Sequence, residues 1–238
     1  MQDPRNNDNN KELPARSGVE LERFLVGIRG FRTRFYERHP ETMQKLVSEG
    51  QRPTALMIAC SDSRVDPALL LDAEPGDLFV VRNVANLVPP YHLGRGPNGV
   101  SAAIEYAVRD LGVRHIIVLG HAHCGGIRAL LATATGERPQ RDFLADWVSM
   151  ALDACWQYVP DRPGEGVRQV SLERLRDFPY LVERAAIHGS LRNLRSYPWI
   201  REALIERRLA LHGWWFDLET GDLWTTDGSE EPFLPLAE

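Results

Sequence analysis

The sequence predicts an α/β fold with a mostly parallel central β-sheet flanked by helices. Three short apolar runs carry this prediction, at residues 54–59, 78–81 and 115–119. Each run is apolar at nearly every position, as in strands whose sheet is covered by helices on both faces. A helical pattern at 99–110 separates the second run from the third, and this alternation of strand and helix favours parallel pairing.

The N-terminal region predicts a disordered tail followed by a helical arm. Residues 1–17 are rich in Asn, Asp and Pro and offer little to bury, so structure is expected to begin near Gly18. Apolar side chains then recur at helical spacing; they are Leu21, Phe24, Leu25, Ile28, Phe31 and Phe35. The pair His39-Pro40 ends this helix or begins the next. The apolar stripe packs either on its own domain or on a partner subunit.

The C-terminal third predicts helices and then an antiparallel addition to the sheet. Residues 140–206 look largely helical, and 209–218 read as a further strand. Residues 222–226 follow the turn Thr220-Gly221 and predict a hairpin return, which makes an antiparallel edge strand. There is no internal repeat or Gly/Ser linker, so 18–238 is interpreted as a single domain.

Composition excludes several classes of protein. The 238 residues carry a formal net charge of −5, with no basic stripe of the kind that binds nucleic acid. No apolar run approaches the roughly 18 residues of a membrane span, and the N-terminus lacks the apolar stretch of a secretory signal. Three cysteines, an odd number, argue against a disulfide framework. The expected compartment is the cytoplasm.

Two cysteines and a histidine are expected at one edge of the sheet, where α/β proteins bind ligands. Cys60 directly follows the first predicted strand, and His121 and Cys124 follow the third. Thiolate and imidazole are preferred zinc ligands, and three of them leave a fourth position free, as in catalytic sites. Two buried, unpaired cysteines would explain the pattern equally well. Cys155 lies in a helical pattern and is assigned to packing.

Asp62 and Arg64 flank this candidate site in the turn after Cys60. They form either a surface salt bridge of little energetic value or a functional pair, in which Arg64 holds Asp62 beside the metal. The segment Gly94–Gly99 matches the pattern G-x-G-x-x-G of dinucleotide-binding loops but follows no strand and contains a proline, so it is interpreted as a loop. Asn98 is expected to cap the next helix.

Taken together, five segments resemble the β-class carbonic anhydrases, over residues 20–226. The segments are Cys60–Arg64 (CSDSR), Val81–Asn86 (VRNVAN), Glu105–Ala107 (EYA), Gly120–Gly126 (GHAHCGG) and Gly213–Gly221 (GWWFDLETG). The resemblance implies one Zn²⁺ per subunit, held by Cys60, His121 and Cys124. It also implies that Asp62 and Arg64 form a catalytic dyad that orients a zinc-bound hydroxide for the reversible hydration of CO2 to bicarbonate and a proton.

The resemblance further implies a homodimer at least, with active sites near the subunit interface, and tetramers or octamers in many relatives. Members of the open, plant-like type resemble this chain at Gln51, Phe79 and Tyr106, whose equivalents line the substrate pocket in those relatives. We add Val84 to its apolar wall and Gly125 as the start of a helix that faces an anion. The type whose aspartate closes on zinc has a tryptophan before the cysteine motif. Here no tryptophan precedes Trp147, so the open type is favoured. A departure from the family is His123.

Two alternatives keep the same scaffold: a CS2 or COS hydrolase, and a zinc-binding relative without catalytic activity. The presence of both Asp62 and Arg64 argues against the second. Because two thiolates neutralise the charge of the metal, its bound water should be less acidic than at an all-histidine site. The expected activity therefore rises through mildly alkaline pH.

Overall fold

The computed structural model describes residues 16–92, 96–137, 141–152, 171–228 and 231–236. The chain divides into two compact units, residues 1–50 and 51–238, and each is described here by itself. Most of the predicted tail and the predicted packing role of Cys155 lie outside the described residues. The interpretation of 18–238 as one domain stays a prediction.

The first unit is helical. Helix α1 (Arg16–Arg32) continues into a π-helical turn at Thr33–Arg38, and helix α2 (Pro40–Glu49) begins directly after His39. The expected helical arm and its break at His39-Pro40 are thus confirmed. Phe35 is buried, but Leu21, Phe24 and Ile28 are more than half exposed. Most of the apolar stripe is therefore left open to water.

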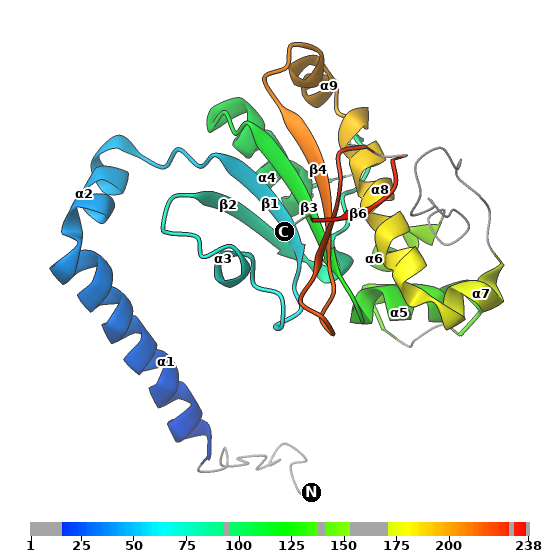
Figure 1. The fold of residues 1–238 in the computed structure, drawn as a ribbon, viewed down its shortest axis with the longest axis horizontal. Coiled ribbons are helices and arrows are strands. Elements are labelled where there is room, and N and C mark those ends of the chain that lie inside the picture. Colours follow the sequence, from blue (N-terminus) through cyan, green and yellow to red (C-terminus); the bar gives the residue numbers. More distant parts are fainter. Residues whose placement is uncertain (1–15, 93–95, 138–140, 153–170, 229–230, 237–238) are drawn as a thin grey trace, which may run out of the picture. The chain divides into compact units, whose positions relative to one another are not determined.

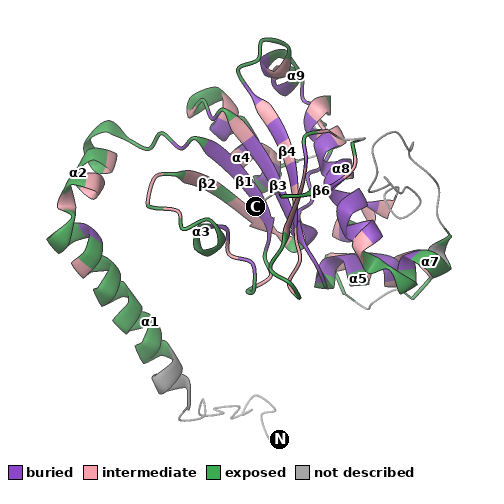
Figure 2. Ribbon diagram, in the orientation of Figure 1, coloured by how far each residue is buried: buried purple, intermediate pink, exposed green. Residues whose placement is uncertain are grey.

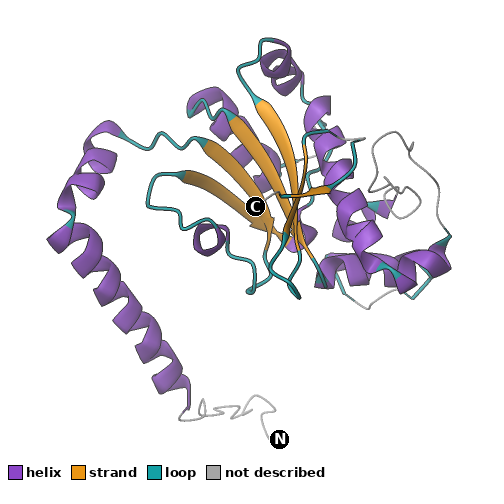
Figure 3. Ribbon diagram, in the orientation of Figure 1, coloured by secondary structure: helices purple, strands orange, loops and turns teal. Residues whose placement is uncertain are grey.

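The second unit is built on a six-stranded mixed sheet in the order β2-β1-β3-β4-β5-β6 (Figure 3). The strands are β1 (Ala55–Cys60), β2 (Leu78–Asn83), β3 (His115–His121), β4 (Ala210–Phe216), β5 (Leu223–Thr226) and β6 (Leu234–Pro235). The first four are parallel, β5 pairs antiparallel with β4, and β6 pairs antiparallel with β5. The predicted fold class is confirmed, including the antiparallel return near the C-terminus.

Helices connect and cover these strands (Figure 1). They are α3 (Pro67–Leu70), α4 (Gly99–Glu105), α5 (Gly125–Ala134), α6 (Leu144–Ser149), α7 (Leu172–Asp177), α8 (Pro179–Ser196) and α9 (Pro198–Ile205). Helix α4 continues into a π-helical turn at Tyr106–Asp110, so the predicted pattern at 99–110 is helical throughout. The side chain of Asn98 accepts from the backbone N–H groups of Val100 and Ser101, which confirms the expected cap.

The main core lies between the sheet and helix α8, and strands β1 and β3 and most of α8 are buried (Figure 2). Ile187 and Leu191 of α8 pack against strand residues such as Ile116. The helix approaches the sheet closely because Gly213 has no side chain: a Cβ there would lie 2.8 Å from Ile187. Among the described helices, none has the length and hydrophobicity that crossing a membrane requires.

Candidate metal centre

Cys60, His121 and Cys124 converge at the carboxyl edge of the parallel sheet. Cys60 is the last residue of β1, His121 is the last residue of β3, and Cys124 immediately precedes α5. Their ligand atoms all lie within 4.8 Å of one another, and all three side chains are buried. Because β1 and β3 are parallel neighbours, the ends of both strands meet at this edge.

The donor set fits a zinc ion. The Sγ atoms of Cys60 and Cys124 are 3.9 Å apart, and a tetrahedral zinc ion with Zn–S bonds of about 2.3 Å separates two sulfur ligands by roughly 3.8 Å. His121 contributes a nitrogen whose orientation is set by its backbone: Nδ1 donates to the carbonyl of Ala122 at 2.8 Å. That bond leaves the lone pair on Nε2, which is buried and has no hydrogen-bond partner among the described residues.

The two thiols are electrostatically coupled. The hydrogen bond from Cys124 lowers the pKa of Cys60, against the opposing effect of burial. The same bond, together with burial, raises the pKa of Cys124. A second thiolate beside the first is thus disfavoured unless a cation compensates the charge. A divalent metal ion provides this compensation, so the pair matches the chemistry of a metal site.

Asp62 and Arg64 form a bidentate ion pair next to the Cys-His-Cys cluster. Arg64 Nε donates to Asp62 Oδ1 at 2.9 Å and Nη2 donates to Oδ2 at 2.7 Å. Arg64 Nη2 also donates to the carbonyl of His123 at 3.2 Å, which ties the pair to the loop between the metal-ligand candidates. The Arg64 side chain holds the pKa of Asp62 well below its usual range. Asp62 Oδ2 lies 3.8 Å from Nε2 of His121, so an ionised carboxylate faces the cluster.

Arg82 supports the backbone of this turn, a role that the sequence analysis did not assign. Its guanidinium donates to the carbonyl of Cys60 at 3.0 Å, to that of Asp62 at 2.6 Å and to the carboxylate of Asp66 at 2.8 Å. Arg82 lies on β2, which pairs with β1, so it reaches the end of the neighbouring strand. Arg82 lies in the segment Val81–Asn86, which carries part of the family resemblance. That match was the one sequence feature that could have pointed to its role.

Glu183 supports the other side of the cluster and was also missed. Its carboxyl group is buried and accepts from the backbone N–H of Cys124 and from the indole Nε1 of Trp215, both at 3.1 Å. Burial raises the pKa of Glu183. It lies on α8, 59 residues after Cys124, and no local pattern marks it. Its carboxyl group thus connects α8 and β4 to a candidate metal ligand.

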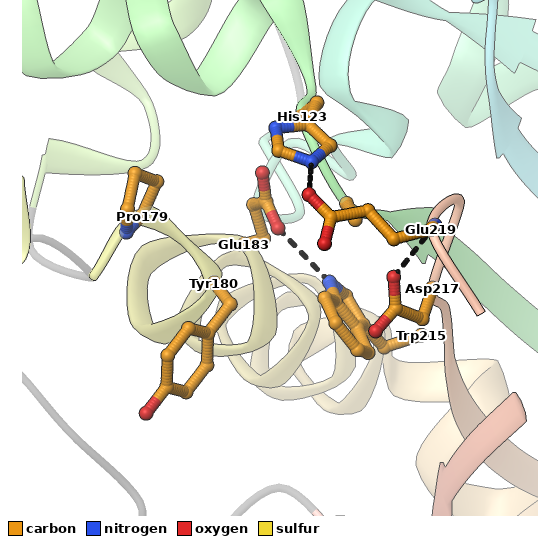
Figure 4. A pocket seen from close by; sticks show the side chains of 8 residues that line it. His123, Pro179, Tyr180, Glu183, Trp215, Asp217 and Glu219 are labelled. Carbon is orange, nitrogen blue, oxygen red and sulfur yellow. Dashed lines mark hydrogen bonds and ion pairs between the residues drawn. The ribbon is translucent and has the colours of Figure 1, made fainter. Parts of the chain in front are cut away.

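A small cavity of about 170 Å³ adjoins Glu183 and Trp215 (Figure 4). His123 and Glu219 close one side of it, and the carboxylate of Glu219 accepts from His123 Nε2 at 2.7 Å. Both side chains are exposed. His123, where the chain departs from the family pattern, is therefore engaged in a solvent-facing hydrogen bond within the loop between His121 and Cys124.

Val84 and Gly125 lie near the cluster within this chain. Gly125 is the residue after Cys124 and begins α5. Its neighbour Gly126 contacts the turn at Val84–Asn86: a Cβ on Gly126 would lie 2.7 Å from Val84 Cγ1 and 2.8 Å from the Cβ of Ala85. Ala85 itself has a φ of 65°, so this turn is held in a left-handed conformation by close packing.

Phe79 and Tyr106 lie elsewhere on the sheet. Their ring centroids are 5.9 Å apart. Phe79 pairs with Leu56, which lies four residues before Cys60 along β1. At about 3.3 Å per residue, this places Phe79 roughly 13 Å from the end of the strand. Gln51 is exposed and precedes β1. The single chain therefore separates these three predicted pocket residues from the candidate ligands of its own cluster.

The fold and the cluster together define an α/β protein with a candidate catalytic metal site of the Cys-His-Cys kind. Residues 55–223 match the model of the carbonic anhydrase family. The chain is 35% identical to beta carbonic anhydrase 3 of Arabidopsis thaliana, over 97% of this chain and 86% of that protein. It is 40% identical to a carbonic anhydrase of Pseudomonas aeruginosa, over 90% of this chain and 91% of that protein.

Solved structures agree with this assignment. The β-carbonic anhydrase CcaA superimposes with a TM-score of 0.75 at 33% identity, covering 93% of this chain and 94% of that one. One of two tetrameric β-carbonic anhydrases from Sordaria macrospora superimposes with a TM-score of 0.71 at 28% identity, covering 92% and 100%. The chain belongs to the β-class carbonic anhydrase family, and the prediction of an enzyme of this class is confirmed.

Proposed function

We propose that this chain catalyses the reversible hydration of CO2 to bicarbonate and a proton at a zinc ion held by Cys60, His121 and Cys124. The observation that carries the proposal is the convergence of three buried donors within 4.8 Å, with Nε2 of His121 left without a hydrogen-bond partner in the part of the chain that the structure describes. When bound, zinc would supply the Lewis acidity that makes water a nucleophile near neutral pH.

Asp62 is proposed to orient the attacking water. A carboxylate can only accept hydrogen bonds, so Asp62 would take one from the water and direct an oxygen lone pair toward the carbon of CO2. Arg64 would keep Asp62 ionised and hold its carboxylate against the guanidinium, because Arg64 donates to both carboxylate oxygens. This arrangement supports the open type of site, in which Asp62 stays paired with Arg64.

A second copy of the chain is proposed to complete the substrate pocket. Phe79 and Tyr106 contact one another far along the sheet from their own cluster, and Tyr106 is 46% exposed. Together with Gln51 they would face the cluster of a partner subunit, beside its Val84 and Gly125. The open apolar stripe of α1 supports association of copies. Light scattering that finds only monomers at assay concentrations would contradict this part of the proposal.

The experiment is stopped-flow CO2 hydration by zinc-loaded protein from about pH 6.5 to 9, the range in which zinc-bound water ionises. The expected result is turnover that rises with pH and is abolished by chelation. A matched sample of Cys124→Ser should hold less zinc and lose activity in proportion. CS2 and COS serve as comparison substrates. Absence of CO2 turnover in a zinc-loaded sample across the whole range would overturn the proposal.

A further inference from the structure

A pair of histidines lies at the opposite end of β3 from the Cys-His-Cys cluster. His115 is the first residue of β3 and His121 is the last, about 20 Å away at the rise of a strand. His212 lies on the neighbouring parallel strand β4, where it pairs with Ile117. Since side chains two residues apart share a face, His115 and His212 lie on the same face of the sheet. His115 Nδ1 and His212 Nε2 are 3.2 Å apart.

The tautomer of His212 is set by an acidic residue. Asp227 follows the last residue of β5 and accepts from His212 Nδ1 at 2.9 Å. A carboxylate cannot donate, so Nδ1 of a neutral His212 carries the hydrogen and Nε2 carries the lone pair. That lone pair faces His115. A carboxylate that fixes the ring of a histidine in this way is the usual outer support of a metal ligand.

His115 is also suited to act as a ligand. Burial, the neighbouring His212 and Arg114 lower the pKa of His115, the direction that favours the neutral imidazole. Two nitrogen ligands on one ion, with bonds of about 2.0–2.1 Å and angles between square and tetrahedral, lie roughly 2.9–3.3 Å apart. The observed separation of 3.2 Å falls within that range. Arg114 is exposed, so water screens its repulsion of a cation.

We propose that His115 and His212 form a second metal site, distinct from the Cys-His-Cys cluster, which takes a divalent transition-metal ion such as Ni²⁺ or Zn²⁺. Imidazole suits these ions, and softer thiolate ligands are not required. Asp227 acts as the positioning residue that holds His212. With two protein ligands, the remaining positions belong to water or small anions, and the ion is exchangeable. The proposal does not depend on the function of the first cluster.

The test is calorimetric titration of zinc-loaded protein with Ni²⁺ at neutral pH. The expected result is one equivalent bound per chain, lost in both His115→Ala and His212→Ala. His39→Ala is the matched control: it removes an imidazole that lies 3.7 Å from the carboxylate of Glu41 and should leave Ni²⁺ binding unchanged. Equal Ni²⁺ binding in all four proteins, or no binding to the parent protein, would overturn the proposal.

Asp227→Asn separates a metal site from a simple hydrogen-bonded pair. Loss of an outer-shell carboxylate should weaken Ni²⁺ binding about ten-fold, while Asp222→Asn, in the preceding turn, should not. Nitrogen NMR of the imidazoles should find His212 protonated at Nδ1 in the parent protein before Ni²⁺ is added. A resonance pattern that places the hydrogen on Nε2 instead would contradict the assignment of His212 as a ligand.

Discussion

Strand β3 carries a histidine at each end, and the two ends are supported differently. His121 is 1% exposed, its Nδ1 is held by a backbone carbonyl, and two buried cysteines face its other nitrogen. His115 is half-buried, and its partner His212 is held by Asp227, whose side chain is 87% exposed. Two histidines on one strand thus differ in burial and in the group that fixes the ring, although their residue type is the same. Buried donors with backbone support favour tight binding, and exposed support favours exchange.

A third histidine sharpens this comparison. His188 on α8 is as buried as His121 and also hydrogen-bonds through Nδ1 to a carbonyl, that of Gly228 at 3.1 Å. Burial lowers the pKa of His188 to about 4. At His121 burial acts in the same direction, but contact with Cys60 reverses it and the pKa is raised. The thiol of Cys60 and the carboxylate of Asp62 therefore distinguish the surroundings of His121 from those of His188, since burial and the backbone hydrogen bond are shared.

The largest expected effect comes from Arg64→Ala, which removes the side-chain hydrogen bonds to Asp62 beside the His121 end of β3. Without the two side-chain bonds, Asp62 is free to turn toward the ligands, and kcat should fall about a hundred-fold at unchanged zinc content. Stopped-flow assays across pH measure the loss. Arg109→Ala is the control, because it also removes an arginine–carboxylate ion pair: Arg109 lies 2.8 Å from Glu105, and both side chains are exposed. Full activity of Arg64→Ala at every pH would disprove the dyad.

Glu183→Gln should have a smaller effect, on zinc affinity. A carboxyl group offers an acceptor to both Cys124 N–H and Trp215 Nε1, whereas an amide has one oxygen and must set its NH2 group against the other donor. Zinc affinity should fall about ten-fold, measured by chelator competition. The absorption spectrum of the Co²⁺-loaded variant should shift as well.

The control for this change is Glu137→Gln, on an exposed carboxylate paired with Arg176 at 3.3 Å. It should alter neither zinc affinity nor the Co²⁺ spectrum. If Glu183→Gln matched this control in both measurements, Glu183 would be a packing residue with no influence on Cys124.

The smallest expected effect is the pH dependence contributed by His188. Its pKa is about 4 in the folded protein and about 6.5 when unfolded, so the unfolded chain binds the extra proton between these values. The contribution is fully present above about pH 6.5 and is lost as pH falls toward 4. Lowering the pH from about 7.5 to 5.5 should cost about 1 kcal/mol of unfolding free energy through this residue.

Urea unfolding at the two pH values measures this contribution. His188→Gln should retain the rest of the pH dependence and lose this part, because an amide does not titrate. An identical slope in the two proteins would show that His188 accepts its proton in the folded state, contrary to its burial beside Arg184 and Arg192.

The strands and the three candidate ligands could be predicted because each depends on local pattern. The apolar runs end at or near Cys60 and His121, and parallel strands bring their carboxyl ends to one edge whatever the rest of the fold does. Asp62 and Arg64 are two residues apart, so a turn suffices to join them. The helical arm and the capping role of Asn98 were likewise readable from spacing and residue type.

The predicted pocket residues did not follow in the same way. Phe79 and Tyr106 carry a signal through family resemblance, but their distance from the cluster depends on the register of β2 against β1. Arg82 and Glu183 are missed for a related reason: they reach Cys60 and Cys124 across 22 and 59 residues of chain. Nothing in the local sequence marks a long-range hydrogen bond.

The sequence by itself determined the fold class, the edge at which chemistry is expected and the candidate donors Cys60, His121 and Cys124. The tertiary structure alone decided which groups hold those donors in place, and it alone brought His212 within 3.2 Å of His115. The physical reason is the sequence separation over which each interaction acts. Hydrophobic periodicity and turn chemistry act over a few residues, whereas strand register and the packing of α8 on the sheet are set by the collective burial of the core.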